Sequence, residues 1–149
     1  MPPTVSLHLP SRLPEAGELP PARAFARVLG RAGAATGEIA LVLVDAGEIR
    51  RLNREFRGKD RATDVLSFDY REPGDGRDVR DVWGDVYVSD EAARDQAHER
   101  GIPFPEELAR LFLHGALHLL GFRDDTPQEL ERMTGVQEEL LEQLLGPSR

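Results

Sequence analysis

The chain contains no cysteine. This absence excludes disulfide bonds and thiolate metal sites, so any bound metal must use imidazole, carboxylate or water as ligands. Long hydrophobic runs are also missing, because no stretch approaches the roughly 20 apolar residues that span a bilayer. The first residues lack the basic start and the apolar run of an export signal. We therefore expect a cytoplasmic protein without a membrane partner.

Basic residues are fewer than acidic residues, with 19 Lys and Arg against 27 Asp and Glu, which gives a net charge of −8. Affinity for phosphates needs concentrated Lys and Arg, so this balance argues against a generic nucleic-acid binder, and we expect no DNA partner. Residues 50–61 are the exception, because six cations face two acids there, a net charge of +4 that leaves −12 for the rest. This segment is either a solvated helix face, with Arg51 and Glu55 as an ion pair, or a surface for a polyanionic substrate.

The hydrophobic pattern predicts a single domain over residues 1–149, with strands early and helices late. We expect strands at 5–9, 39–45, 63–70 and 83–89. We expect helices at 21–33, 46–57 and 89–100, another that includes 111–120, and a last one from 126 onward. The residues from 10 to 21 read as a proline-rich connecting loop. This order favours an α+β fold, with a small mixed sheet of about four strands packed against about five helices.

Three of these elements carry more detailed predictions. The continuous apolar run at 39–45 is typical of a strand buried on both faces. The strands at 63–70 and 83–89 should form a hairpin with a long loop. The last helix has one apolar stripe, and we expect it to serve packing and solubility without chemistry.

The most informative stretch is LFLHGALHLLGFRDD, residues 111–125, which contains His114 and His118. Side chains four apart share a helix face, so both imidazoles can point at one ion. Gly121 should end this helix, and the chain could then return Asp124 as a third ligand. The helix is apolar on nearly every side, which implies burial, and buried imidazoles need partners. A metal satisfies both rings together, while the alternative is a pair of ordinary core histidines.

Two blocks of sequence also resemble a known family. The segment LNREFRGKDRATDVLSF, residues 52–68, contains an Asn, an Arg-Gly-Lys-Asp run and a Thr-Asp-Val-Leu-Ser-Phe run, and HGALHLLGF at 114–122 contains the histidine pair. The pair Gly84-Asp85 fits as well. Over about residues 39–145, the chain resembles the bacterial YbeY family, the rRNA-maturation metallo-endoribonucleases.

The resemblance implies that His114 and His118 bind one zinc ion on a central helix, with a third ligand six residues beyond His118. Family members usually have histidine there, whereas this chain has Asp124, with Asp125 as a fallback ligand. Zinc accepts a carboxylate oxygen at close to the imidazole distance. The carboxylate shifts the preference slightly toward manganese or iron, although zinc remains the preferred ion.

The resemblance also assigns roles to residues outside the metal centre. Arg57 matches the arginine that is functionally important in the family and would stabilise charge on the phosphorane oxygens, whereas its alternative role is an exposed ion-pair partner. Asp85 would either orient a metal-ligating histidine through its other ring nitrogen or merely form local hydrogen bonds. The residues that would follow the RNA backbone are Arg50, Arg51, Arg54, Lys59 and Arg61.

The implied function is a single-strand-specific, metal-dependent endoribonuclease. It would act in maturation of the small-subunit rRNA 3′ end and in ribosome quality control, with rRNA and a ribosomal particle as partners. Two alternatives stay open. One is a ribosome-assembly or ribosome-binding factor with a structural metal, although structural zinc usually has four protein ligands and only three are evident. The other is a metalloprotease of the H-E-x-x-H type, in which Gly115 stands where the glutamate base belongs.

Overall fold

The fold is α+β, as predicted, in a computed structural model that describes residues 2–10, 19–76 and 78–146. The elements, in chain order, are β1 (Thr4–His8), α1 (Ala22–Arg31), β2 (Thr36–Val44), α2 (Ala46–Arg57), β3 (Val65–Asp69), β4 (Asp81–Ser89), α3 (Asp90–Arg100), α4 (Phe104–Leu119) and α5 (Pro127–Leu145). The four strands make one mixed sheet in the order β1-β2-β4-β3. The expected loop from 10 to 21 falls largely on residues 11–18, outside the described residues.

The sheet combines parallel and antiparallel pairing. Strands β1, β2 and β4 run parallel, and β3 pairs with β4 in the antiparallel direction, which confirms the predicted hairpin with its long loop. Strand β3 lies at the edge of the sheet, so one side of its backbone has no strand partner in the described part of the chain. This free edge borders the site described below.

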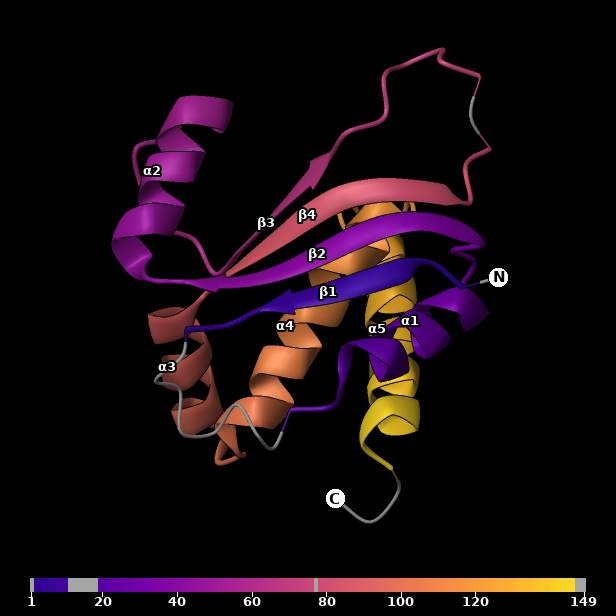
Figure 1. Cartoon of the computed structure of the whole chain (residues 1–149). Helices are drawn as coiled ribbons and strands as arrows, with labels where there is room; N and C mark the ends of the chain where they lie inside the picture. Colours follow the sequence, from indigo (N-terminus) through magenta and orange to yellow (C-terminus); the bar gives the residue numbers. More distant parts are fainter. Residues whose placement is uncertain (1, 11–18, 77, 147–149) are drawn as a thin grey trace.

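The helices cover the two faces of the sheet unequally. Of the described elements, helices α1, α3, α4 and α5 lie on one face, and only α2 lies on the other (Figure 1). Along β2, the side chains of Ile39, Leu41 and Leu43 are buried, whereas the residues between them are half-buried. The expectation that this strand is buried on both faces is therefore wrong, because the single helix α2 covers only part of the second face.

Helix α4 forms the centre of the core. Thirteen of its 16 residues are buried, and the other three, which are half-buried, are Glu106, His114 and His118. The helix approaches the sheet closely at Gly115, where an added Cβ atom would lie 2.3 Å from Cγ1 of Val86. The predicted burial of this helix is thus confirmed, but its two histidines lie on the side left open.

Gly115 gives a prediction about stability. The Gly115→Ala variant should lower the free energy of unfolding by about 1–3 kcal/mol, because the new methyl group overpacks the contact with Val86. Urea denaturation measures this, with Gly135→Ala on α5 as the control, since nothing lies within 4 Å of the Cβ position there. Equal stability of Gly115→Ala and the parent would contradict the close packing.

Helix α5 is the longest helix of the described residues, with 19 residues, and begins with a capping box formed by Thr126 and Glu129. It buries Met133, Leu140 and Leu141 against the core, as its apolar stripe predicted. No helix in the described part of the chain has both the length and the apolar character needed to cross a bilayer. However, α5 also buries Gln137, a polar residue that turns out to reach the site.

Candidate metal centre

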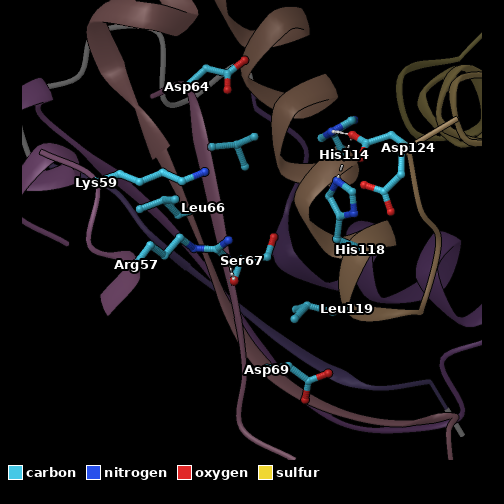
Figure 2. A pocket seen from close by; sticks show the side chains of 12 residues that line it. Arg57, Lys59, Asp64, Leu66, Ser67, Asp69, His114, His118, Leu119 and Asp124 are labelled. Carbon is cyan, nitrogen blue, oxygen red and sulfur yellow. Dashed lines mark hydrogen bonds and ion pairs between the residues drawn. The ribbon is translucent and has the colours of Figure 1, made fainter. Parts of the chain in front are cut away.

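Three side chains converge where α4 ends. His114 and His118 project from successive turns of α4, and Asp124 returns from the following turn to face them (Figure 2). Oδ2 of Asp124 lies 3.3 Å from Nε2 of His118 and 3.6 Å from Nε2 of His114. One ligand atom from each residue lies within 4.8 Å of the others. The structure thus brings together the three residues that the sequence predicted as metal ligands.

The turn after α4 explains how Asp124 reaches the histidines. Gly121 has φ +94°, a conformation that side-chain-bearing residues rarely adopt, and it reverses the chain where predicted. The N–H of Phe122 then donates to the carbonyl of Leu117 at 3.0 Å. Asp125, the fallback ligand, pairs instead with Arg123 and is not part of the three-residue cluster. The backbone geometry therefore favours Asp124.

The donor set fits a first-row divalent cation. With metal–ligand bonds of about 2.0–2.2 Å, tetrahedral ligand atoms lie about 3.3–3.6 Å apart, which matches both carboxylate–imidazole distances. Each Nδ1 atom already has a protein partner: that of His118 lies 3.0 Å from the carbonyl oxygen of Phe122, and that of His114 lies 2.7 Å from Oε1 of Gln137. Both Nε2 atoms are therefore left to face Asp124. The cluster could hold a metal ion.

Asp85 does not contact either histidine, and it forms local hydrogen bonds instead, which is the second of its two predicted roles. Side chains alternate along β4, so Gly84 and Val86 face α4 while Asp85 faces the opposite side. Its carboxylate accepts hydrogen bonds from the hydroxyls of Tyr70 and Tyr87. Burial and this carboxylate together raise the pKa of Tyr70 above its ordinary value. The partners of the histidine rings are instead the Phe122 carbonyl and Gln137.

A pocket of about 590 Å³ opens beside the histidines. Figure 2 shows that β3 and the end of α2 form one wall, and α4 with the turn after it forms the other. The residues lining the pocket are Arg57, Lys59, Asp64, Val65, Leu66, Ser67, Asp69, His114, His118, Leu119, Asp124 and Asp125. The candidate metal centre and two cationic side chains thus share one cavity.

Arg57 ends α2 and is held against the free edge of β3. Its Nη2 donates to the carbonyl oxygen of Ser67 at 2.7 Å, and its guanidinium lies 5.6 Å from the ring centroid of Phe68. No carboxylate pairs with Arg57 within the described ranges, so the alternative role as an ion-pair partner has no support there. The remaining N–H groups stay available to a ligand in the pocket.

The other cations of residues 50–61 divide into two groups. Arg51 pairs with Glu48 and Glu55. Asp60 forms ion pairs with Arg50 at 2.8 Å and with Arg54 at 3.6 Å. The solvated-face interpretation therefore describes these three arginines. Lys59 and Arg61 have no carboxylate partner among the residues described, and Lys59 lines the pocket. RNA binding by the five cations stays a prediction.

Three residues near the site were not singled out from the sequence. Gln137 contacts His114 from α5, and Asp64 lines the pocket with its carboxylate accepting from Nε2 of Gln96 at 3.2 Å. Arg71 donates to the carbonyl of Leu119 at the end of α4 and pairs with Asp69, whose pKa it holds below the ordinary value. Of these three, only Asp64 could have been found from the sequence, because it lies inside the block at 52–68 that resembles the family.

Comparison with known proteins gives the context of this site. The family model described as Endoribonuclease YbeY matches residues 23–145. The chain belongs to the YbeY family. An Endoribonuclease YbeY from Brevibacillus brevis is 40% identical over 119 residues, covering 72% of this chain and 75% of the relative. Another, from Geobacillus thermodenitrificans, is 44% identical over 110 residues and 70% of each chain.

A solved structure extends the similarity to the fold. The solution structure of TM1509 from Thermotoga maritima matches with a TM-score of 0.65 and 27% identity, over 94% of this chain and 88% of that one. The family model and the curated relatives confirm the family resemblance predicted from the two sequence blocks. Both blocks of the YbeY resemblance contribute to the pocket, since Arg57 and Lys59 come from the first and the two histidines from the second.

Proposed function

We propose that this YbeY-family chain is a metal-dependent endoribonuclease that cleaves single-stranded RNA during rRNA maturation. The observation that carries the proposal is one pocket holding both a three-donor cluster and Arg57 with Lys59. The curated relatives bear the name Endoribonuclease YbeY, which supports RNA as the substrate class. We further propose that the rRNA is presented by a ribosomal particle, at the small-subunit 3′ end or during ribosome quality control.

His114, His118 and Asp124 would hold the ion, with zinc preferred over manganese or iron. When bound at such a site, the ion supplies Lewis acidity toward a phosphate oxygen and lowers the pKa of a coordinated water. Three protein ligands are the number found in catalytic zinc sites, in which the fourth position is left to water or substrate. The open pocket beside the three residues gives substrate a route to that position.

Arg57 would bind the phosphate that is cleaved. A guanidinium donates two parallel N–H groups to phosphate oxygens, and its charge opposes the negative charge that develops during cleavage. The hydrogen bond to the Ser67 carbonyl fixes the side chain before substrate arrives, which lowers the entropic cost of binding. Lys59, on the same wall, would bind a neighbouring phosphate as a point charge.

The two alternatives have less support in the geometry. A structural metal usually has four protein ligands, and the cluster found among the described residues has three. A zincin-type protease needs a glutamate directly after the first histidine. Gly115 occupies this position, and a Cβ atom there would already lie 2.3 Å from Val86. A glutamate side chain at this position would collide with Val86, so the protease mechanism lacks its base.

The third ligand provides a test with a matched control. Asp124→Asn should weaken zinc binding and reduce cleavage of single-stranded RNA by at least about 10-fold, because a neutral amide is a poorer ligand than a carboxylate. Asp125→Asn removes the adjacent charge, which pairs with Arg123, and should leave both quantities within about 3-fold. Competition titration and a fluorescent RNA assay measure the two effects. Equal losses in both variants would contradict the assignment of Asp124.

A further inference from the structure

Gln137 connects α5 to the candidate metal centre. Its side chain is buried, with 7% exposure, and Oε1 lies 2.7 Å from Nδ1 of His114. His118 is held differently, because its Nδ1 faces the backbone carbonyl of Phe122. A carbonyl can only accept, so this bond fixes the His118 tautomer irrespective of any side chain. The tautomer of His114 depends on how the Gln137 amide is oriented.

The neighbouring residue settles the orientation of that amide. Nε2 of Gln137 donates to Oε2 of Glu138 at 3.1 Å. Arg110 donates to both oxygens of the same carboxylate, at 2.9 and 3.0 Å, and holds the pKa of Glu138 below its ordinary value. An ionised carboxylate only accepts, so a flipped amide would set two acceptor oxygens against each other. Oε1 therefore points at His114, and Nδ1 of that ring carries the proton.

The network closes on α4 itself. Arg110 lies four residues before His114, on the same face of the helix. The Arg110 side chain is 10% exposed, and its Nη1 also donates to the buried Glu107 carboxylate at 2.8 Å. The path runs from Arg110 across to Glu138 and Gln137 on α5 and back to His114. The path therefore begins and ends on the same helix, α4, at Arg110 and His114.

We propose that Gln137 is a positioning residue that holds His114 in the Nδ1–H tautomer and so directs its Nε2 toward Asp124. The proposal deepens the proposed function, because it concerns the same metal centre. A ligating histidine commonly donates its second ring N–H to an acceptor, and loss of this acceptor costs about 10- to 100-fold in metal affinity. The tautomer, however, is a property of the metal-free protein and does not depend on any RNA activity.

The test uses two variants of Gln137 and one control. Gln137→Leu removes the acceptor, whereas Gln137→Glu keeps one. The control is Gln143→Leu, on the same helix, whose Oε1 accepts from Arg31 at an exposed position. NMR of the ring nitrogens of the metal-free proteins at about pH 8, where an ordinary histidine is neutral, reports the tautomer. Competition titration then gives the zinc affinity.

The parent, Gln137→Glu and Gln143→Leu should all show Nδ1–H at His114. Gln137→Leu should show a mixture of tautomers and a zinc affinity lower by about 10- to 100-fold. If Gln137→Leu does not fold, Glu138→Gln takes its place, because a neutral amide there no longer prevents the flip, and a second tautomer should appear. A pure Nδ1–H ring in the folded test variant would overturn the proposal. If the unmodified protein did not cleave RNA, that result would count against the proposed function but not against the role of Gln137.

Discussion

Replacing His114 with alanine should reduce cleavage of single-stranded RNA by at least about 10³-fold. A metal ion contributes several kcal/mol of transition-state stabilisation, and each 1.4 kcal/mol corresponds to about tenfold in rate. His114 is one of three donors with ligand atoms within 4.8 Å of each other, so its removal leaves too few ligands to retain the ion. Single-turnover cleavage of a fluorescent RNA by zinc-loaded protein measures the loss.

A histidine outside the cluster supplies the control. His98 lies in the last turn of α3 and is exposed, so His98→Ala should cleave at the parent rate. The half-buried His114 contributes little apolar packing, and both variants should melt cooperatively within a few degrees of the parent. Cleavage that survives in a folded, metal-free His114→Ala protein would show that the metal centre is not the site of reaction.

Replacing Arg57 with alanine should reduce cleavage by about 10²- to 10³-fold while zinc affinity stays the same. The guanidinium lines the pocket and bonds to the Ser67 carbonyl, but it is not a donor of the cluster. Arg57→Lys should recover part of the activity, since an ammonium keeps the charge and loses the bidentate geometry. The variants separate charge stabilisation from metal binding, which the His114 variant cannot do.

Arg54 is the matched control for this second prediction. It lies one turn earlier on α2, is more than half exposed and pairs with Asp60 at 3.6 Å. Arg54→Ala should change cleavage by no more than about 3-fold, because an exposed cation contributes little alone. If Arg54→Ala and Arg57→Ala lost activity equally, the basic segment would act through its overall charge, and the specific role of Arg57 would be wrong.

Local signals in the sequence predicted most of the fold. The N-cap of α2 is Asp45, and its carboxylate accepts from the Glu48 N–H at 2.7 Å. Gly121 reverses the chain, and the last helix starts at the expected Thr126-Pro127. These features depend on a few neighbouring residues, because caps and turns are short-range structures. The three candidate ligands were predictable for the same reason, since all three lie within one helix and its turn.

The errors concern which face of an element meets which neighbour. Alternation along β4 separates Asp85 from Val86, but only the tertiary arrangement decides that α4 covers the Val86 side. The half-open second face of β2 has the same origin, because a single helix covers it. Gln137 follows Val136 on a helix whose pattern indicated only packing, and its contact spans 23 residues to His114. No local pattern encodes such a pairing between two helices.

The metal content of the protein tests the central claim most directly. Protein purified without chelator and then reconstituted with zinc should contain about one equivalent per chain by elemental analysis. That equivalent should be lost in variants that lack His114, His118 or Asp124, the three converging donors. Less than about half an equivalent of any transition metal, with no rise on reconstitution, would contradict the account.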